Sequence, residues 1–148
     1  MKPTDKISEH FNYAEITHSN LAKGIGMNNE PPAELLPKFQ QMADMILENV
    51  RAHFGKPIII TSWYRNPQLN EMLGSKPTSQ HILGEAVDFV VKDIPNIEVC
   101  KYIRDNLTFD QIILERTWVH CSFVDENNRK EVLTCYDGRT YKKGLRNA

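Results

Sequence analysis

The longest regular pattern of apolar side chains has helical spacing and follows the proline-containing residues 28–32. Its members form one broad apolar face, and they are Leu35, Phe39, Met42, Ala43, Ile46, Leu47, Val50 and Phe54. Such a face predicts a long amphipathic helix that packs against the core. Pro37 must lie in its first turn, because deeper inside it would remove a backbone hydrogen bond. Gly55 is expected to end the helix.

Several shorter runs are rich in β-branched and aromatic residues, which favours strands. The predicted strands cover residues 58–61, 86–91, 111–115, 118–123 and 131–136. Two shorter helices are predicted at residues 67–73 and 95–107, each with a proline near its start. Residues 1–30 are expected to be mostly irregular, and the tail at residues 138–148 to be loosely held. These elements predict an α+β fold with a small antiparallel sheet packed against helices.

Length and charge narrow the class of protein. The chain has 148 residues, the size of one domain, and is long enough to bury a core without disulfides or other staples. Its 18 basic and 19 acidic residues give a formal net charge of -1, which argues against nucleic-acid binding as the main task. No apolar run approaches the ~20 residues of a membrane-spanning helix. A monomer is the default expectation.

The start of the chain and its cysteines indicate the compartment of synthesis. Residues 1–6 are polar and lack the apolar centre of a signal peptide, so synthesis in the cytoplasm is expected. Cys100, Cys121 and Cys135 are odd in number and have unrelated spacings, which argues against a disulfide framework. Each is expected to act as a small buried apolar side chain.

Two imidazoles and one carboxylate form a candidate metal site. His81 and Asp88 lie on either side of Gly84, and His120 lies on a later predicted strand. These donors suit Zn²⁺, and three of them leave the fourth position of a tetrahedron free for water, as in catalytic zinc sites. A bound ion lowers the pKa of that water and so generates a nucleophile at ordinary pH. The sequence therefore predicts a hydrolase with one zinc ion.

Each of these residues also has an ordinary structural interpretation. A histidine in a strand is more often a packed or surface residue than a ligand, and Asp88 could cap a strand end. The combination favours the metal site, because a carboxylate between Val87 and Phe89 needs a partner if it is buried. Alternation along the strand sends His120 to the face opposite Cys121, which makes Cys121 a poor ligand candidate.

These residues also resemble a known family. Ser-x-His-x-x-Gly-x-Ala-x-Asp at residues 79–88, followed by Trp-x-His at residues 118–120, resembles the zinc D-Ala-D-Ala carboxypeptidase family. The likeness is especially to phage-encoded and small bacterial members, and the family is related in fold to hedgehog signalling domains. It extends over residues 8–123, through similar segments at residues 8–11, 55–58, 61–67 and 109–113. The resemblance implies a hedgehog/DD-peptidase-like sheet that carries a zinc site.

The resemblance also implies roles for individual residues. His81, Asp88 and His120 correspond to the metal ligands, and Arg65 and Ser79 to substrate-binding residues. A guanidinium suits such a role, because it offers a fixed fork of donors to a peptide carboxylate or carbonyl. Arg65 could instead bind loop carbonyls, and Ser79 could instead cap the turn that follows it.

The general base departs from the family's pattern. Members commonly carry an acidic residue three positions before the last histidine, where this chain has Thr117, and the nearest acid is Glu115. A hairpin of residues 111–115 and 118–123 would place Glu115 beside the turn. There it could take a proton from zinc-bound water and pass it to the leaving amine. The other interpretation is a solvated turn glutamate, and Glu85 is a second candidate for the base.

These expectations describe a zinc metallopeptidase that cuts an amide bond in peptidoglycan stem peptides, with no nucleic-acid or membrane partner. A D-Ala-D-Ala carboxypeptidase and an endolysin-type endopeptidase both fit, because the pocket around residues 74–78 would set that choice. Since peptidoglycan lies outside the membrane, the resemblance implies release from the cytoplasm by a partner such as a phage holin. The alternative is a non-catalytic zinc-containing module that binds cell wall or is hedgehog-like, and the displaced acid keeps it open.

Overall fold

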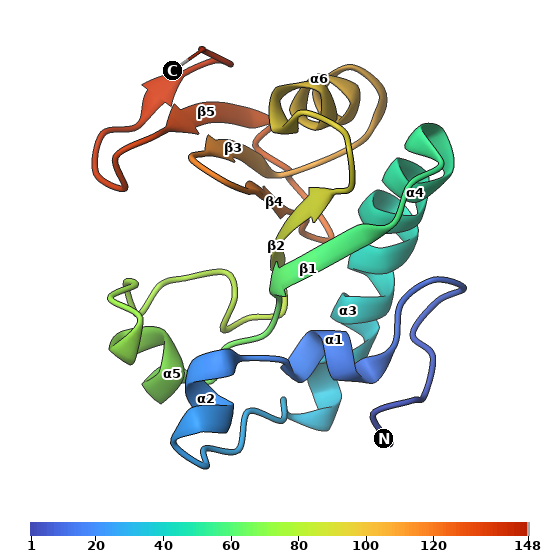
Figure 1. Cartoon of the computed structure of the whole chain (residues 1–148), viewed down its shortest axis with the longest axis vertical. Coiled ribbons are helices and arrows are strands. Elements are labelled where there is room, and N and C mark those ends of the chain that lie inside the picture. Colours follow the sequence, from blue (N-terminus) through green and yellow to red (C-terminus); the bar gives the residue numbers. More distant parts are fainter. Residues whose placement is uncertain (148) are drawn as a thin grey trace.

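The computed structural model describes residues 1–147 and is built around a six-stranded sheet (Figure 1). Ala148, at the end of the predicted tail, lies outside the described residues. The strands are β1 (Ile58–Ser62), β2 (Ala86–Val91), β3 (Gln111–Glu115), β4 (Val119–Ser122), β5 (Glu131–Cys135) and β6 (Lys142–Lys143). Their order across the sheet is β1-β2-β4-β3-β5-β6. The five predicted strands are confirmed, together with the α+β class.

The sheet is mixed, whereas the sequence predicts an antiparallel one. Every neighbouring pair is antiparallel except β3 and β5, which run parallel with Gln111 opposite Glu131. The cause is the connection after β4. Because β4 is already flanked by β2 and β3, the chain crosses through residues 123–130 to the free edge of β3 and begins β5 beside the start of that strand.

The helices lie largely where the apolar pattern places them. They are α1 (Tyr13–Thr17), α2 (Asn20–Gly24), α3 (Leu36–Met42), α4 (Glu48–Phe54), α5 (Pro67–Met72) and α6 (Asn96–Asn106), with a 3-10 turn η1 (Ala33–Leu35) and a π-helical segment η2 (Ala43–Leu47). The predicted long helix is confirmed as the continuous run η1-α3-η2-α4. Pro37 lies in the first turn of α3, and Gly55 ends α4 with a left-handed φ of 64°. None of the helices within residues 1–147 is long and apolar enough to span a membrane.

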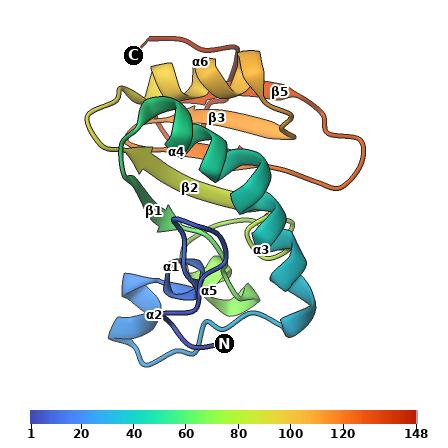
Figure 2. The same ribbon diagram turned by 90° about the vertical axis from the view of Figure 1, so that its right-hand side faces the viewer.

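One face of the sheet packs against the long helical run and α6, and Figure 2 shows α4 lying across it. The buried side chains at this contact include Ile46, Leu47, Val50, Val87, Phe89, Val99, Cys100, Ile103, Ile112, Val119 and Cys121. Alternation along the strands sends the residues between them to the opposite face. We call that opposite face the site face. In Figure 1, α5 and the loop before β2 lie on its side of the sheet, away from α4.

Both ends of the chain are more regular than predicted. Residues 1–30 contain α1, which Asn12 and Glu15 cap by reciprocal hydrogen bonds, and α2, which Ser19 caps. Two helices of five residues each are too short for an apolar period to reveal. The tail is not loose over its whole length, because β6 pairs with β5 along the outer edge of the sheet.

Candidate metal centre

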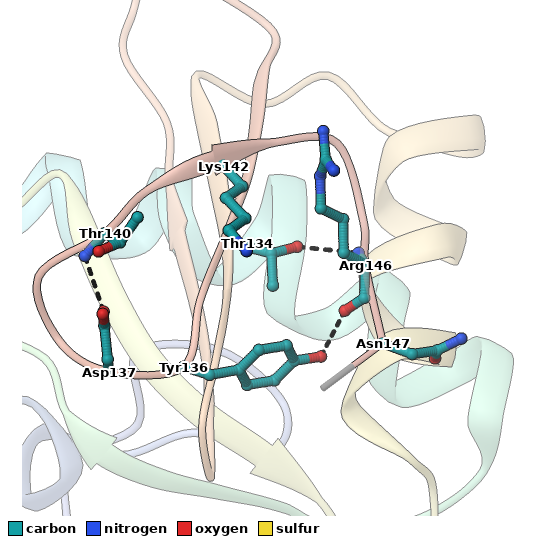
Figure 3. Close-up of a pocket in the computed structure, with 7 residues that line it drawn as sticks. All are labelled: Thr134, Tyr136, Asp137, Thr140, Lys142, Arg146 and Asn147. Carbon is teal, nitrogen blue, oxygen red and sulfur yellow. Dashed lines mark hydrogen bonds between the residues drawn. The ribbon is translucent and has the colours of Figure 1, made fainter.

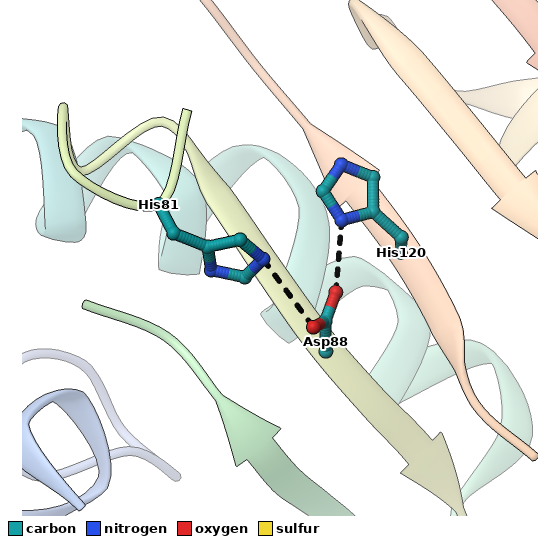
Figure 4. Close-up of side chains that lie close together, drawn as sticks. All are labelled: His81, Asp88 and His120. Atoms are coloured by element: carbon teal, nitrogen blue, oxygen red, sulfur yellow. Dashed lines mark hydrogen bonds and ion pairs between the residues drawn. The ribbon is translucent and has the colours of Figure 1, made fainter. Parts of the chain in front are cut away.

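His81, Asp88 and His120 meet on the site face of the sheet (Figure 4). Asp88 lies in β2 directly opposite His120 in β4, and His81 comes from the loop before β2. Asp88 Oδ1 lies 2.8 Å from His120 Nδ1, and Asp88 Oδ2 lies 3.3 Å from His81 Nε2. One donor atom from each residue lies within 4.8 Å of the other two. The three residues predicted as metal ligands are therefore brought together.

The donor set fits a zinc ion. Neutral imidazole nitrogens and a carboxylate oxygen are ordinary zinc ligands, at metal distances of about 2.0–2.2 Å. Donors held tetrahedrally at that distance lie roughly 3–4 Å from one another. The separations of 2.8 and 3.3 Å around Asp88 are close to this range. Three protein ligands also leave one tetrahedral position for water or substrate.

Strand alternation puts two of the three residues on the site face. Val87 and Phe89, on either side of Asp88, are fully buried in the core, and so are Val119 and Cys121, on either side of His120. The two polar side chains must therefore point the other way, as predicted. Burial raises the pKa of the Cys121 thiol, so this side chain stays protonated among apolar neighbours and is a poor ligand, also as predicted.

The loop that carries His81 depends on glycine. Gly84 has a left-handed φ of 73°, and a Cβ at this position would lie 3.2 Å from a ring carbon of Phe39. The turn before it is held by backbone bonds from Ile82 N to Ser79 O (3.2 Å) and from Leu83 N to Gln80 O (3.2 Å). Glycine therefore lets the chain turn tightly over the helical layer and enter β2.

A backbone carbonyl orients the first imidazole. His81 Nδ1 lies 2.7 Å from the carbonyl oxygen of Trp63. Because a carbonyl can only accept, Nδ1 carries a proton, and Nε2 is the ring nitrogen that faces Asp88 and is available to bind a cation. An imidazole held in this way by an outer partner is typical of metal-ligating histidines. The sequence does not identify this partner, since any backbone carbonyl can serve.

The charge of Asp88 is set by its surroundings. Burial alone would raise the pKa of Asp88, but the positive charge and hydrogen bonds offered by His81 and His120 hold it well below its usual range. Arg65 adds a third partner, with Nη2 lying 3.3 Å from Asp88 Oδ2. The carboxylate is therefore ionised at neutral pH, as a metal ligand must be.

Arg65 is held at the site by side chains rather than by the loop carbonyls of the alternative interpretation. Its Nε donates to Ser62 Oγ (3.0 Å), and its Nη1 donates to Ser75 Oγ (3.0 Å) and to Asn70 Oδ1 (3.4 Å). Ser62 lies opposite Asp88, where the register of β1 shifts. Burial lowers the pKa of Arg65 somewhat, while Asp88 acts in the opposite direction. The guanidinium is thus fixed beside the candidate ligands.

Ser79 has the local role that sequence reasoning gave as its alternative. Its Oγ accepts a hydrogen bond from the backbone N–H of His81 (3.3 Å), which stabilises the turn before the first candidate ligand. The hydroxyl proton is not used in that bond. The side chain is half-buried and stands two residues before His81.

Glu115 lies beside the metal residues, at the end of the predicted hairpin. Its N–H donates to Trp118 O across the turn (3.1 Å), and the β3–β4 pairing is confirmed. Burial raises the pKa of the Glu115 carboxyl, and the negative charge of Asp88 raises it further. By contrast Glu85, the second candidate base, forms an ion pair with Lys38 (2.8 Å). Glu115 is therefore the better-placed carboxylate.

A polar cluster behind the His81 loop was not predicted from the sequence. Asp110, only 3% exposed, accepts from Arg129 Nη2 (2.7 Å), Ser122 Oγ (3.2 Å) and Gln80 Nε2 (3.1 Å). Arg129 Nη2 also donates to Gln80 Oε1 (3.2 Å). Both ends of the Gln80 side chain are thus occupied, and Gln80 immediately precedes His81. The cluster anchors the loop that carries the first candidate ligand.

A second missed residue anchors the Arg65 loop. Asn29, 6% exposed, donates from its side-chain amide to the carbonyls of Thr17 and Tyr64, both at 3.0 Å. Its Oδ1 accepts from Asn66 N at 2.9 Å. Asn29 therefore ties the N-terminal segment to the chain on both sides of Arg65. Its only sequence signal is an asparagine pair before two prolines, which also marks an ordinary turn.

The sheet, the convergent His-Asp-His group and the adjacent carboxylate are the arrangement expected of a metal-dependent hydrolase. The family model of Peptidase M15 matches residues 9–122, which include all three residues of the group. The chain belongs to this family, whose members are zinc-dependent metallopeptidases. The resemblance drawn from residues 8–123 is thereby confirmed. Comparison with curated proteins found no match.

Proposed function

We propose that this protein hydrolyses an amide bond in peptidoglycan stem peptides, using one zinc ion held by His81, Asp88 and His120. The observation that carries the proposal is the convergence of these three donors within 4.8 Å, next to Glu115. Membership of the Peptidase M15 family supports a peptide substrate. The zinc ion, when bound, supplies an activated water and polarises the scissile carbonyl.

Glu115 is the proposed general base. Its carboxylate carries a negative charge next to the site, and burial makes it a stronger base than an exposed glutamate. It takes a proton from the attacking water and gives that proton to the nitrogen of the leaving amine. Its raised pKa suits both steps, since a base poised nearer neutrality can also act as the acid.

Arg65 and Ser79 are proposed to hold the substrate. The Arg65 guanidinium is fixed by Ser62, Asn70 and Ser75, so it can donate to a substrate carboxylate or carbonyl without losing side-chain freedom on binding. The Ser79 hydroxyl, with its oxygen bonded to the N–H of His81, can donate its proton to a substrate carbonyl. Donors aimed at developing negative charge stabilise the transition state.

Replacement of the base tests the catalytic part of this proposal. Glu115→Gln should lower kcat by about 10²–10⁴-fold while one zinc ion per chain is retained, because the side chain is not among the ligands. Release of new amines from purified peptidoglycan gives the rate, and elemental analysis gives the metal content. Glu126→Gln, in an exposed turn, is the matched control and should behave as the original protein.

Two results would contradict the proposal. Bound zinc without turnover on any stem peptide would instead identify a non-catalytic wall-binding module. An unchanged rate in Glu115→Gln would remove Glu115 from the mechanism. Mass spectrometry of digested muropeptides then separates a carboxypeptidase, which releases the terminal D-alanine, from an endopeptidase, which cuts within the stem.

A further inference from the structure

The site face continues past His81, Asp88 and His120 to the C-terminal end of the chain. The register of the sheet aligns one residue from each of five neighbouring strands in a single row: Asp88, His120, Ile113, Leu133 and Lys143. Directly paired residues point to the same face of a sheet. Lys143 in β6 therefore shares the face of the proposed zinc ligands, and its side chain is exposed.

A neighbouring row leads from the candidate base to a tyrosine. Glu115 pairs with Cys135, and Thr134 pairs with Lys142, so Tyr141 follows beside Cys135 on the site face. Burial raises the pKa of the Tyr141 hydroxyl, and the charge of Glu115 raises it further, which agrees with this placement. The Tyr141 side chain is nevertheless 53% exposed. Its ring is therefore accessible at the rim of the site.

The hairpin that carries these two residues is held firmly from its other face. Figure 3 shows the pocket there, of about 350 Å³, which is lined by Thr134, Tyr136, Asp137, Thr140, Lys142, Arg146 and Asn147. Thr134 Oγ1 accepts from Arg146 N (3.0 Å), and Tyr136 Oη donates to Arg146 O (2.5 Å). Lys142 alternates with Tyr141 and Lys143, so it points into this pocket and away from the site face.

The charge of the hairpin differs from that of the chain as a whole. Residues 139–146 contain four basic side chains and no acidic one, in a chain with a formal net charge of -1.

Three strand spacings separate His120 from Lys143, or roughly 14 Å. An extended peptide covers this distance in about four residues. A stem peptide with one end at the metal residues can therefore reach Lys143.

We propose that Tyr141 and Lys143 form a subsite for a free carboxylate of the peptide substrate, a few residues away from the scissile bond. The ammonium of Lys143 pairs with the carboxylate, and the Tyr141 hydroxyl donates a hydrogen bond to the same group or to a neighbouring carbonyl. The hairpin lies outside the part of the chain that the family model matches, residues 9–122. The subsite would thus contribute to the substrate specificity of this chain in particular. This inference rests on the proposed function.

Matched lysine variants test the subsite. The probes are the synthetic peptide L-Ala-γ-D-Glu-L-Lys-D-Ala-D-Ala and two derivatives, each with one of its two carboxylates amidated. Lys143→Met should raise KM for the free peptide about two- to fivefold with kcat unchanged, as expected for an exposed ion pair. If the free peptide is preferred over the derivative in which the carboxylate bound by Lys143 is amidated, Lys143→Met should abolish that preference. Lys142→Met, the neighbouring lysine on the opposite face, should change neither quantity.

Binding to an inactive variant separates this inference from the proposed function. In Glu115→Gln, the Kd of the uncleaved peptides is measured by calorimetry, with and without Lys143→Met. Loss of the preference for the free carboxylate in the double variant supports the subsite even if no turnover is found. Equal effects of Lys143→Met and Lys142→Met, or a preference that survives Lys143→Met, would overturn it. Tyr141→Phe should give a smaller loss in the same direction.

Discussion

Two regions of the same sheet differ in how far their polar side chains are buried. These regions are the central strands β2 and β4 and the outer hairpin β5–β6. In the centre, Asp88 is 5% exposed and is bonded to both histidines and to Arg65. In the hairpin, Tyr141 and Lys143 are exposed on the same face. Residues whose geometry must be exact for chemistry are thus fixed by packing, while residues that select a ligand remain adjustable at the rim.

The largest expected effect is at the centre. Asp88→Asn keeps the size of the side chain but removes the negative charge that balances Arg65 and that makes the Asp88 oxygens good ligands for a cation. We expect loss of stoichiometric zinc and of all peptidase activity, measured by elemental analysis and by amine release. His18→Ala, at an exposed histidine, is the control and should keep both. Full zinc content in Asp88→Asn would remove Asp88 from the ligand set.

The cluster behind His81 should show an effect of intermediate size that depends on pH. Burial alone would raise the pKa of Asp110, but bonds from Arg129 and Gln80 lower it from 3.8 to about 2. Because the folded value lies below the unfolded one, this stabilisation is complete above roughly pH 4 and is lost as the pH falls toward 2. The difference amounts to about 2 kcal/mol in the free energy of unfolding.

Asp110→Asn tests this linkage. Urea unfolding at neutral pH should show a loss of about 2 kcal/mol relative to the original chain, and that gap should close between pH 4 and pH 2. Zinc affinity should also fall, by about 10–100-fold, since Gln80 no longer anchors the His81 loop as firmly. A gap that stays constant with pH would mean that the carboxylate charge does not stabilise the fold.

Gly84→Ala should affect fewer properties than Asp110→Asn, because its effect is limited to stability and loop geometry. The left-handed φ of 73° and the contact of 3.2 Å with Phe39 each oppose a methyl group. We expect a loss of roughly 1–3 kcal/mol in thermal or urea unfolding. Gly138→Ala is the matched control, with a similar φ of 74° and open space around its Cβ, so it separates backbone strain from crowding. Equal losses in the two variants would show that Phe39 contributes nothing.

Much of the centre could be predicted from the sequence because its signals are local. The alternation of Val87, Asp88 and Phe89 fixes which side chain leaves the core, and Gly84 marks the turn before them. The hairpin that carries His120 is predicted by two β-prone runs separated by two residues, Arg116 and Thr117. Such features need only neighbouring residues to be read.

The rest of the site depends on pairs that are distant along the chain. The partner of His81 is the backbone carbonyl of Trp63, which has no side-chain signature. Asp110 meets Gln80 and Arg129 only after the sheet has formed. The parallel pairing of β3 with β5 likewise depends on which edge of the sheet is still free. The sequence of a single segment does not reveal which edge that is.

The outer hairpin has a further consequence for solubility. Without residues beyond β4, the backbone amides and carbonyls along one side of β3 would be left unpaired, a template on which a second molecule could add its own strand. β5 covers that side, and β6 then finishes the sheet with only two residues, Lys142 and Lys143. An edge strand this short, with a lysine on each of its faces, disfavours the addition of a strand from another copy at this edge of the sheet.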